Sequence, residues 1–480
     1  MAIPTVEATD KLRGGILMRK WWPLAAVCLG TFMFLLDTTV VTVALPDIGD
    51  DMSAPLPALQ WVVTVYPLVL AVSLLTMGAL ADRHGARAVY VAGLAVFGVA
   101  SLSCGLAPDP GMLIAARAVQ GVGGAAMAVT TFALIGSVYR GPVLGRAMGV
   151  FAAVTGLAAA TGPVLGGVLT QYLGWRAVFF LNLPLVAVAV ALSLRVLAAA
   201  RPGTGTRLDL PGTVAFAVCG GSLTYALTSA GETGPLSPAV LGPLALAALA
   251  FAVFVRVELR GTAPLLDVRL FTRASFSGVM TCVIASTSAF AALVYTSLWL
   301  QSGLGLGPVR AGVALMPLAL ASFATSLIGG RGLHHKSPRA VLSAGLLLSG
   351  AGCALQAGVN AHSSAASLTV GLAVTGVGVG LTGPVMGTAV LAAFPPERSG
   401  MAAGAMTAFR QLGQTLWAAA FGALFRHGGG PMTDGLNRVL IATAAAGAVG
   451  SVLAWTFVPR TAGEEASASD HRKHTGSRAR

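Results

Sequence analysis

The chain has 480 residues, of which 55% are hydrophobic and only 10% are charged, and its mean hydropathy is +0.80. A soluble protein carries about 25% charged residues, so this composition excludes a soluble globular protein and predicts a polytopic membrane protein. The net charge of +13 does not indicate a nucleic-acid partner, because the basic residues lie in short loops and in the tail without interleaved aromatic side chains.

Fourteen apolar runs follow one another along the chain, separated by charged and Pro/Gly-rich joints. They cover residues 21–45, 58–81, 87–106, 111–136, 145–171, 175–197, 211–230, 238–257, 275–300, 308–330, 338–359, 365–392, 399–425 and 437–458. Runs of this length cross a bilayer as helices, because backbone groups in lipid need hydrogen bonds within the segment. The first run is too long for a signal peptide, so we interpret it as a retained span.

The basic residues predict the direction of these helices. If the N-terminus is cytoplasmic, most of the 30 Lys and Arg residues fall in cytoplasmic loops and tails. The exceptions are Arg176, Arg310, Arg426 and Arg438 on the outside, and Arg117 and Arg410 within spans. This asymmetry is the positive-inside pattern, which predicts that both termini are cytoplasmic.

One carboxylate, Asp37, lies in the first run, within the stretch FLLDTTVVTVALP. It is the only acid well inside a predicted span, since Asp209 and Glu258 lie at span ends. A charge at this depth costs on the order of 3 kcal/mol and usually faces a polar cavity, and a desolvated carboxyl group can exchange protons near neutral pH. We therefore expect Asp37 to bind a proton or a cationic substrate. The alternative is a structural acid that pairs permanently with Arg117 or caps a helix break.

The fourth run carries the second intramembrane charge, Arg117, in the stretch RAVQGVGGAA. A buried guanidinium needs a partner or water, and a carboxylate in the same cavity would influence its protonation. The alternative is that Arg117 snorkels to the membrane interface. Gln120, three residues further on, shares its helix face and could supply a hydrogen bond.

The fifth run is rich in glycine and contains a proline. The residues concerned are Gly156, Gly162, Pro163, Gly166 and Gly167. Glycines allow neighbouring helices to approach closely, and a proline kinks a helix. The alternative is generic small-residue packing, which says nothing about the direction of transport.

The loop after the second run reads GALADRHGAR. Gly78 and Gly85 permit a tight turn between helices, Asp82 can receive the N-terminal dipole of a neighbouring helix, and Arg83 and Arg87 can hold the membrane interface. The alternative is an ordinary positive-inside loop.

An internal repeat relates the two parts of the chain. An offset of 252 aligns Gly78 with Gly330 and Arg146 with Arg398, although the second loop, GGRGLHHKSPR, lacks the acid. We therefore expect a cytoplasmic segment 1–20, a six-helix half 21–200, two inserted helices 201–260, a second six-helix half 261–459 and a disordered cytoplasmic tail 460–480. Two six-helix halves with a substrate site between them are typical of secondary transporters.

Several of these stretches together resemble the signatures of the major facilitator superfamily, specifically its fourteen-span drug:proton antiporters. They are LDTTVVTVALP (36–46), GALADRHGAR (78–87), RAVQGVGGAA (117–126), TGPVLGG (161–167) with WRAVFFLNLP (175–184), LWLQSGLGLGPVRAGVALMP (298–317) and RSGMAAGAMTAFRQLG (398–413). The resemblance covers nearly the whole chain, in the expected order.

This resemblance implies an all-α membrane fold in which two halves rock around a central cavity. It also implies that the 78–87 loop is a conformational latch, that Arg117 takes part in proton transfer and that the glycine-rich fifth run marks an antiporter. The sequence departs from the family at Thr42, where Asn is common. The second half supplies no intramembrane acid, because Ala289 stands at the position related to Asp37.

We expect the cavity to be lined by apolar and weakly polar side chains. The candidates are Trp61, Tyr66, Gln120, Tyr295, Trp299, Gln301 and Arg410. Side chains of these types could equally face lipid or pack in the core.

The function expected from these patterns is transport. The chain contains no HExxH, GxSxG or G-x-x-x-x-G-K-[ST] motif and no rings of like charge, which argues against an enzyme, an ATP-driven pump and a channel. Five scattered cysteines without CxxC spacing argue against a metal site. We expect a monomeric antiporter of the bacterial cell membrane, without metal or cofactor, that exchanges protons for hydrophobic neutral or monocationic drugs or secondary metabolites. A proton-coupled importer of the same fold is the alternative.

Overall fold

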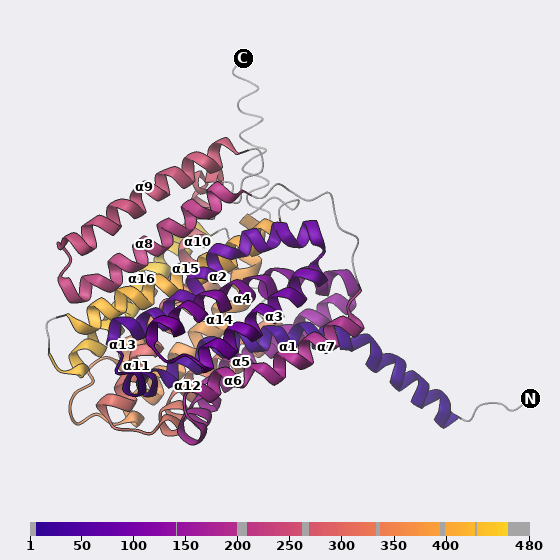
Figure 1. Ribbon diagram of the computed structural model, residues 1–480, viewed down its shortest axis with the longest axis horizontal. Helices are drawn as coiled ribbons and strands as arrows, with labels where there is room; N and C mark the ends of the chain where they lie inside the picture. Colours follow the sequence, from indigo (N-terminus) through magenta and orange to yellow (C-terminus); the bar gives the residue numbers. More distant parts are fainter. Residues whose placement is uncertain are drawn as a thin grey trace, which may run out of the picture.

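A computed structural model describes residues 6–140, 142–198, 209–261, 268–332, 337–393, 399–427 and 430–458. Long α-helices account for nearly all of these residues, and no strand occurs among them (Figure 1). This confirms the predicted all-α class. The predicted tail, 460–480, lies outside the described residues, and the first helix begins within the segment 1–20 that the sequence assigns to a leading cytoplasmic stretch.

The helices fall into two bundles with a helix pair between them in sequence. The N-terminal bundle comprises α1 (Val6–Met52), α2 (Leu56–His84), α3 (Ala86–Gly105), α4 (Pro110–Val138), α5 (Pro142–Leu173), α6 (Arg176–Phe180) and α7 (Asn182–Val196). The central pair is α8 (Leu210–Thr233) and α9 (Pro238–Arg260). The C-terminal bundle comprises η1 (Val268–Thr272), α10 (Ala274–Ser286), α11 (Ser288–Leu298), η2 (Trp299–Gly303), α12 (Pro308–Gly332), α13 (Pro338–Gln356), η4 (Ala365–Leu368), α14 (Thr369–Ala393), α15 (Ser399–Arg426) and α16 (Met432–Phe457).

These helices account for the fourteen predicted spans. Twelve spans in the described part of the chain are long and apolar enough to cross a membrane, and the bent helix α5 makes thirteen. The remaining helix, α15, has 28 residues but carries Arg410, Gln411 and Gln414, which make it more polar. The predicted membrane fold is therefore confirmed.

Two predicted runs are broken in the structure. The run 175–197 becomes α6 and α7, and the run 275–300 becomes α10, α11 and the π-helical turn η2. Between α10 and α11, the backbone N and the Oγ1 of Thr287 both donate to Ile284 O, at 3.1 and 2.7 Å. Such local bonds compete with the regular helix ladder, and the apolar pattern does not reveal them.

Local chemistry explains where several helices begin. Asp109 caps α4, because its Oδ1 accepts from Met112 N at 3.0 Å, and Asp209 caps α8 through Gly212 N at 2.9 Å. Gly85 joins α2 to α3 with φ of 89°, a conformation that other residues rarely adopt. The expected tight turn at Gly85 is therefore present.

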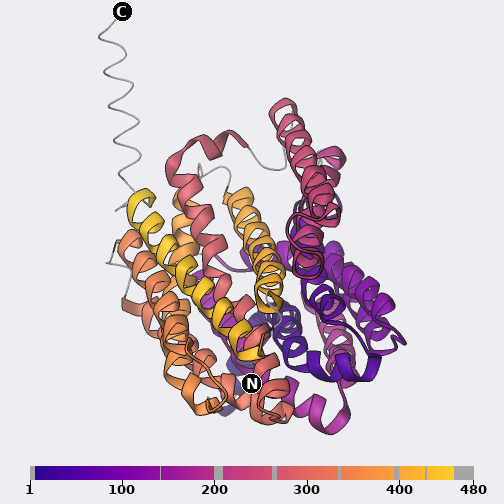
Figure 2. The same ribbon diagram turned by 90° about the vertical axis from the view of Figure 1, so that its left-hand side faces the viewer.

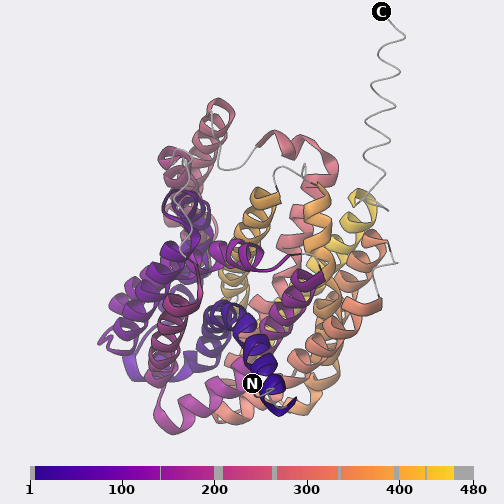
Figure 3. The ribbon, with the colours of Figure 1, turned by 90° about the vertical axis from the view of Figure 1, so that its right-hand side faces the viewer.

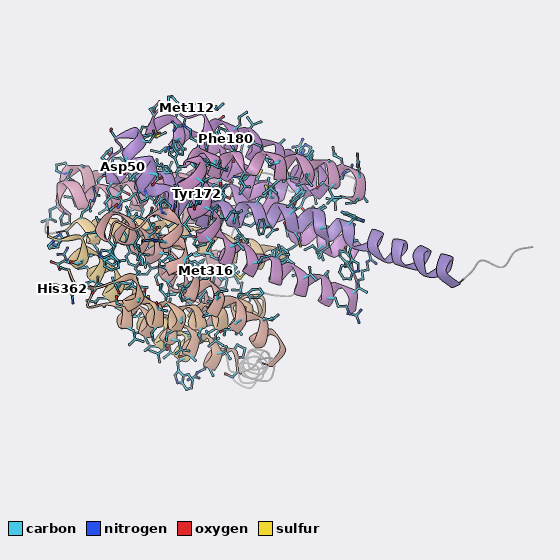
Figure 4. All side chains as sticks on the ribbon, turned by 90° about the horizontal axis from the view of Figure 1, so that it is seen from below. Asp50, Met112, Tyr172, Phe180, Met316 and His362 are labelled. Carbon is cyan, nitrogen blue, oxygen red and sulfur yellow. The ribbon has the colours of Figure 1, made fainter. Side chains whose placement is uncertain are left out.

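The two bundles lie side by side, as Figures 2 and 3 show from opposite directions. We call the end at which α1 enters its bundle and α2 finishes the proximal end, which is on the right in Figure 1. The opposite, distal end carries Asp50 of the N-terminal bundle and His362 of the C-terminal bundle (Figure 4). Helix α8 packs against both α2 and α15, so it contacts one helix of each bundle.

The apolar cores differ between the two ends. Toward the proximal end there are two cores, one containing Leu24 and Phe97 of the N-terminal bundle together with Ala408 of α15, the other containing Phe276 and Leu342. Toward the distal end a single core joins residues of both bundles, such as Leu45, Leu59, Leu298 and Leu315. The bundles are therefore held together at the distal end.

Large apolar side chains also cover the outside of the molecule. On α9 the exposed ones are Leu241, Leu244, Leu246, Leu249, Phe251, Val253 and Leu259, with relative exposures from 38% to 63%. An apolar surface of this extent is typical of a membrane contact, and it agrees with the membrane fold.

Candidate transport site

A charged pair, Asp37 on α1 and Arg117 on α4, lies inside the N-terminal bundle. The two residues are 2% and 1% exposed, and Arg117 Nη1 donates to Asp37 Oδ2. A buried charge requires a partner and further hydrogen bonds. The structure thus brings together the two intramembrane charges that the sequence singles out.

Two amide side chains complete the surroundings of Asp37. Its Oδ1 accepts from Gln120 Nε2 at 3.0 Å and from Asn182 Nδ2 at 3.2 Å. The same two amides donate to Ser101 Oγ, at 2.9 and 2.8 Å, and Gln120 Oε1 accepts from Arg117 Nη1 at 2.6 Å. One polar network therefore links α1, α3, α4 and α7.

Arg117 makes further contacts with α2. Its Nε donates to Val62 O at 3.2 Å, and its guanidinium carbon lies 4.4 Å from the centre of the Tyr66 ring, in cation–π geometry. Tyr66 in turn donates through its hydroxyl to Phe34 O on α1, at 3.4 Å. These contacts exclude the snorkelling alternative for Arg117 in this conformation.

Sequence reasoning missed Ser101 and Asn182 as members of this network. Asn182 lies in the stretch FFLNLP, where a single amide interrupts an apolar run. An amide at this depth needs a hydrogen-bond partner, so it could have been chosen as a candidate. Ser101 offered no comparable signal, because serine is common in membrane helices.

A cavity lies between the two bundles, and we call it the main cavity. It has an empty volume of ≈ 920 Å³, including the space at its open mouth. It is lined by Thr38, Thr39, Thr42, Val43, Val63, Thr64, Pro67, Gly156, Pro163, Phe290, Ala291, Leu293, Val294, Leu315, Leu318, Ala319, Ser322, Phe323, Ser326, Gln414 and Ala418. Among these described lining residues the polar groups are hydroxyls and one amide, and none is ionisable.

Asp37 stands beside this cavity without lining it. The next two residues of α1, Thr38 and Thr39, do line it, whereas Asp37 points into the network with α3, α4 and α7. Successive residues of a helix point about 100° apart, so the charged pair and the cavity occupy different faces of α1.

The proposed cavity aromatics of the N-terminal bundle have other positions. Trp61 lies 6.5 Å from the ring of Tyr225 on α8, and Tyr66 covers Arg117. Gln120 belongs to the polar network. In this conformation these three side chains are not among the described lining of the main cavity, because other interhelical contacts use them.

The candidate cavity residues of the C-terminal bundle also lie outside the lining of the main cavity. Tyr295 lines a separate, smaller cavity, where its hydroxyl accepts from Gln60 Nε2 at 3.2 Å. Trp299 is 2% exposed, and Gln301 Nε2 donates to Val43 O at 2.9 Å. Arg410 is exposed and lies one helical turn before Gln414, outside the lining residues. None of these four lines the main cavity either.

The glycine-rich helix α5 packs closely against both bundles. A Cβ on Gly162 would clash with Thr39 Oγ1, one on Gly166 would lie 2.9 Å from Val40 O, and one on Gly167 would lie 2.5 Å from Pro308 O. The helix bends by 40° between its segments Arg146–Ala158 and Thr161–Leu173, just before Pro163. Close approach and a kink are both what the sequence predicts for this run.

Hydrogen bonds also cross between the bundles near the distal end. Gln301 Nε2 bonds Val43 O, and Val309 N donates to Gln171 Oε1 at 3.2 Å. Together with the shared apolar core, these bonds close the distal side of the cavity.

The predicted latch loop lies at the proximal end. Arg87 Nη2 donates to Leu194 O at 2.6 Å, while Asp82 and Arg83 are exposed. A Cβ on Gly78 would lie 3.4 Å from Val129 Cγ2, an ordinary contact. Within the described part of the chain, no hydrogen bond or ion pair joins Asp82 to another helix. The related loop of the second half lies partly outside the described residues, at 333–336.

A central cavity between two bundles of membrane-spanning helices defines a membrane transporter. Residues 27–339 and 319–479 match the Major Facilitator Superfamily, and the chain belongs to this superfamily. It is therefore a transporter and not an enzyme.

Several relatives have names that describe drug resistance. The chain is 35% identical to the multidrug resistance protein Stp of Mycobacterium tuberculosis, over 84% of this chain and 75% of that protein. It is 37% identical to the puromycin resistance protein pur8 of Streptomyces alboniger, over 83% and 80%. It is 31% identical to the methylenomycin A resistance protein of Streptomyces coelicolor, over 91% and 92%.

The fold is also similar to a solved structure of a peptide transporter, POT, in complex with sulfate. The TM-score is 0.66, the sequence identity is 12%, and the match covers 90% of this chain and 93% of that chain. At this identity the likeness concerns the fold alone.

Proposed function

We propose that this protein exports hydrophobic neutral or monocationic compounds, drugs or secondary metabolites, in exchange for protons. The central cavity is the observation that carries the proposal. Its described lining is apolar, with hydroxyls and one amide and no ionisable group, and such a site accepts compounds that need no counter-charge. The resistance and export names of the relatives support the outward direction.

Alternating access accounts for the transport cycle. We place both termini in the cytoplasm of a bacterial cell, following the positive-inside pattern, and treat the monomer as the working unit. The distal end, closed by the shared core, then faces outward, so this conformation is the inward-facing one. The N-terminal half 21–200 and the C-terminal half 261–459 would rock apart at the distal end, carrying the inserted helices 201–260 with them.

Asp37 and Arg117 are the proposed proton-coupling residues. Protonation of Asp37 removes the negative member of the pair and weakens its bond to Arg117. Because Thr38 and Thr39 of the same helix line the cavity, a change of the pair on one face of α1 can alter the cavity on the other face. Coupling is therefore indirect, and the proton and the substrate need not share one site.

Inverted membrane vesicles with an imposed pH gradient test this function. Ethidium, a fluorescent monocation whose charge is permanent, should accumulate in vesicles that contain the protein and have an acidic interior. Accumulation should collapse when the gradient is dissipated and should not occur in vesicles without the protein. Movement of the dye out of these vesicles would indicate import, and equal movement without a gradient would remove the proton coupling.

A further inference from the structure

The hydroxyl groups of the cavity have a common orientation. Thr38 Oγ1 donates to Phe34 O at 3.1 Å, and Thr42 Oγ1 donates to Thr38 O at 3.2 Å. Thr39 Oγ1 donates to Leu36 O at 3.0 Å. Each of these hydroxyls on α1 has its hydrogen directed at a backbone carbonyl of its own helix.

Two further hydroxyls of the lining also donate to backbone carbonyls, one within its own helix and one to a neighbouring helix. Thr64 Oγ1, on the fully buried Thr64 of α2, donates to Gln60 O at 2.8 Å. Ser326 Oγ on α12 donates to Gly380 O at 3.0 Å. A hydroxyl has one hydrogen and two lone pairs, so a hydroxyl that donates to the backbone can only accept a bond from a molecule in the cavity.

Two lining residues keep a free donor. Neither Gln414 on α15 nor Ser322 on α12 has a hydrogen-bond partner among the residues that the structure describes, and both are partly exposed. The described polar lining thus contains five acceptor-only hydroxyls, one free hydroxyl and one free amide.

We propose that this cavity selects compounds that carry hydrogen-bond donors, such as primary amines, hydroxyls and phenols, over compounds of similar shape without them. The inference rests on the proposed function and specifies its substrate class. A ligand donor that reaches Thr38, Thr42 or Ser326 finds a hydroxyl whose hydrogen is already bound to the backbone and whose oxygen can accept. Within the described lining, a ligand acceptor finds free donors only at Gln414 and Ser322, unless a hydroxyl gives up its bond to the backbone.

Two related dyes test this selectivity. Proflavine, 3,6-diaminoacridine, and acridine orange, its tetramethyl derivative, are both planar monocations with a protonated ring nitrogen. Only proflavine has amino N–H donors. Acridine orange is the more hydrophobic, so apolar burial alone favours acridine orange, and the donor argument favours proflavine.

The primary measurement is the Kd of each dye for the purified full-length protein in lipid nanodiscs, without a pH gradient. We expect proflavine to bind at least about fivefold more tightly, equivalent to about 1 kcal/mol. Equal affinities, tighter binding of acridine orange or no binding of either dye would overturn the proposal.

Paired substitutions locate the effect. Thr38→Val with Thr42→Val removes two acceptors. It preserves the shape of the side chains and the backbone hydrogen bonds of the helix. The preference for proflavine should then fall by about fivefold. Thr38→Ser with Thr42→Ser keeps the hydroxyls and should keep the preference. An unchanged preference in the valine variant would contradict the role of these hydroxyls.

Binding and transport measurements distinguish the two proposals. Donor-selective binding combined with failure of pH-driven export would leave the selectivity intact and would remove only the proposed export. Export of both dyes with no difference in their affinities would support the proposed export and would overturn the proposed selectivity.

Discussion

At the scale of single residues, the pair of Asp37 and Arg117 meets two opposed requirements. A charge in the membrane interior must be neutralised, yet a proton-coupling carboxylate must be able to give up its partner. The network with Gln120, Asn182 and Ser101 supplies neutral bonds that remain when the charge of Asp37 is lost. In the proposed mechanism, Asn182 and Ser101 would act with Asp37 as positioning groups.

Replacing Asp37 by asparagine should preserve the fold and abolish coupling. The new amide side chain would keep one oxygen, either for Arg117 or for Gln120 and Asn182, and could not take up the coupling proton. We expect pH-driven transport to fall at least about tenfold, as for loss of an essential acid–base group, with unchanged membrane insertion. Asp50→Asn, at an exposed acid of the same helix, is the control. Undiminished pH-driven efflux by the Asp37→Asn variant would sink the assignment.

The structural part of the pair can be separated from its transport role. Asp37→Leu leaves a buried Arg117 without its counter-charge and should cost about 3–5 kcal/mol of stability. Adding Arg117→Met removes the unpaired charge and should restore most of that loss, while transport stays absent. Thermal unfolding of the purified variants measures both effects. If the double variant is no more stable than Asp37→Leu, the pair is not the source of the loss.

At the scale of helices, α5 shows how small residues place a substrate cavity between larger elements. Gly156 and Pro163 line the cavity, while Gly162 and Gly166 allow α1 to approach. The bend before Pro163 separates the part of α5 that packs near the distal end from the part that leads toward the proximal end.

Gly162→Ala tests this close packing. The added Cβ would clash with Thr39 Oγ1, so α1 and α5 must separate and the cavity must change shape. We expect transport to fall about tenfold or more, within the roughly 1–3 kcal/mol that overpacking costs. Gly149→Ala on the same helix adds a Cβ that meets nothing within 4 Å and should transport normally. Similar losses in both variants would point to helix stability as the cause.

The latch loop makes a different prediction. Asp82 has no described partner in this conformation, as expected of a latch that engages when the distal end opens. Asp82→Ala should lower turnover in vesicles more than dye affinity in nanodiscs, because the residue biases a conformation without touching substrate. A tenfold loss of affinity with normal turnover would contradict the latch role.

At the scale of the whole molecule, the two bundles share a core at the distal end and separate toward the proximal end. The described lining of the cavity between them has no acid, and Asp37, next to the lining residue Thr38, is already paired with Arg117. The limit on the charge of a substrate therefore follows from the whole cavity lining together with the pairing of Asp37.

Dications should be poor substrates for this reason. A second positive charge in a low-dielectric cavity needs a counter-charge, and without one the penalty is several kcal/mol, or at least about a hundredfold in affinity. Efflux of a matched monocation and dication from the same cells measures the difference. Gln414→Glu places an acid in the lining and should reduce this difference in efflux. Ala289 does not line the cavity, so an acid at that position should not reduce the difference. Equal efflux of both compounds by the unmodified protein would remove the argument.

The sequence by itself determined the features that depend on local composition and on membrane solvation. Fourteen apolar runs had to become helices, because lipid offers no hydrogen bonds to the backbone. Asp37, Arg117 and Gln120 stood out, since polar side chains at that depth are costly. The turn at Gly85 and the close packing of α5 followed from the properties of glycine.

Only the tertiary structure decided which of these groups meet. Whether an aromatic side chain lines a cavity depends on the angle between helices and on the neighbours across the gap, and neither is encoded in the spacing of one run. Trp61, Tyr66, Tyr295 and Trp299 therefore pack against neighbouring helices and are absent from the described lining of the main cavity. The lining threonines and Gln414 were overlooked, because a hydroxyl gains significance only when the fold turns it toward an empty space and directs its hydrogen elsewhere.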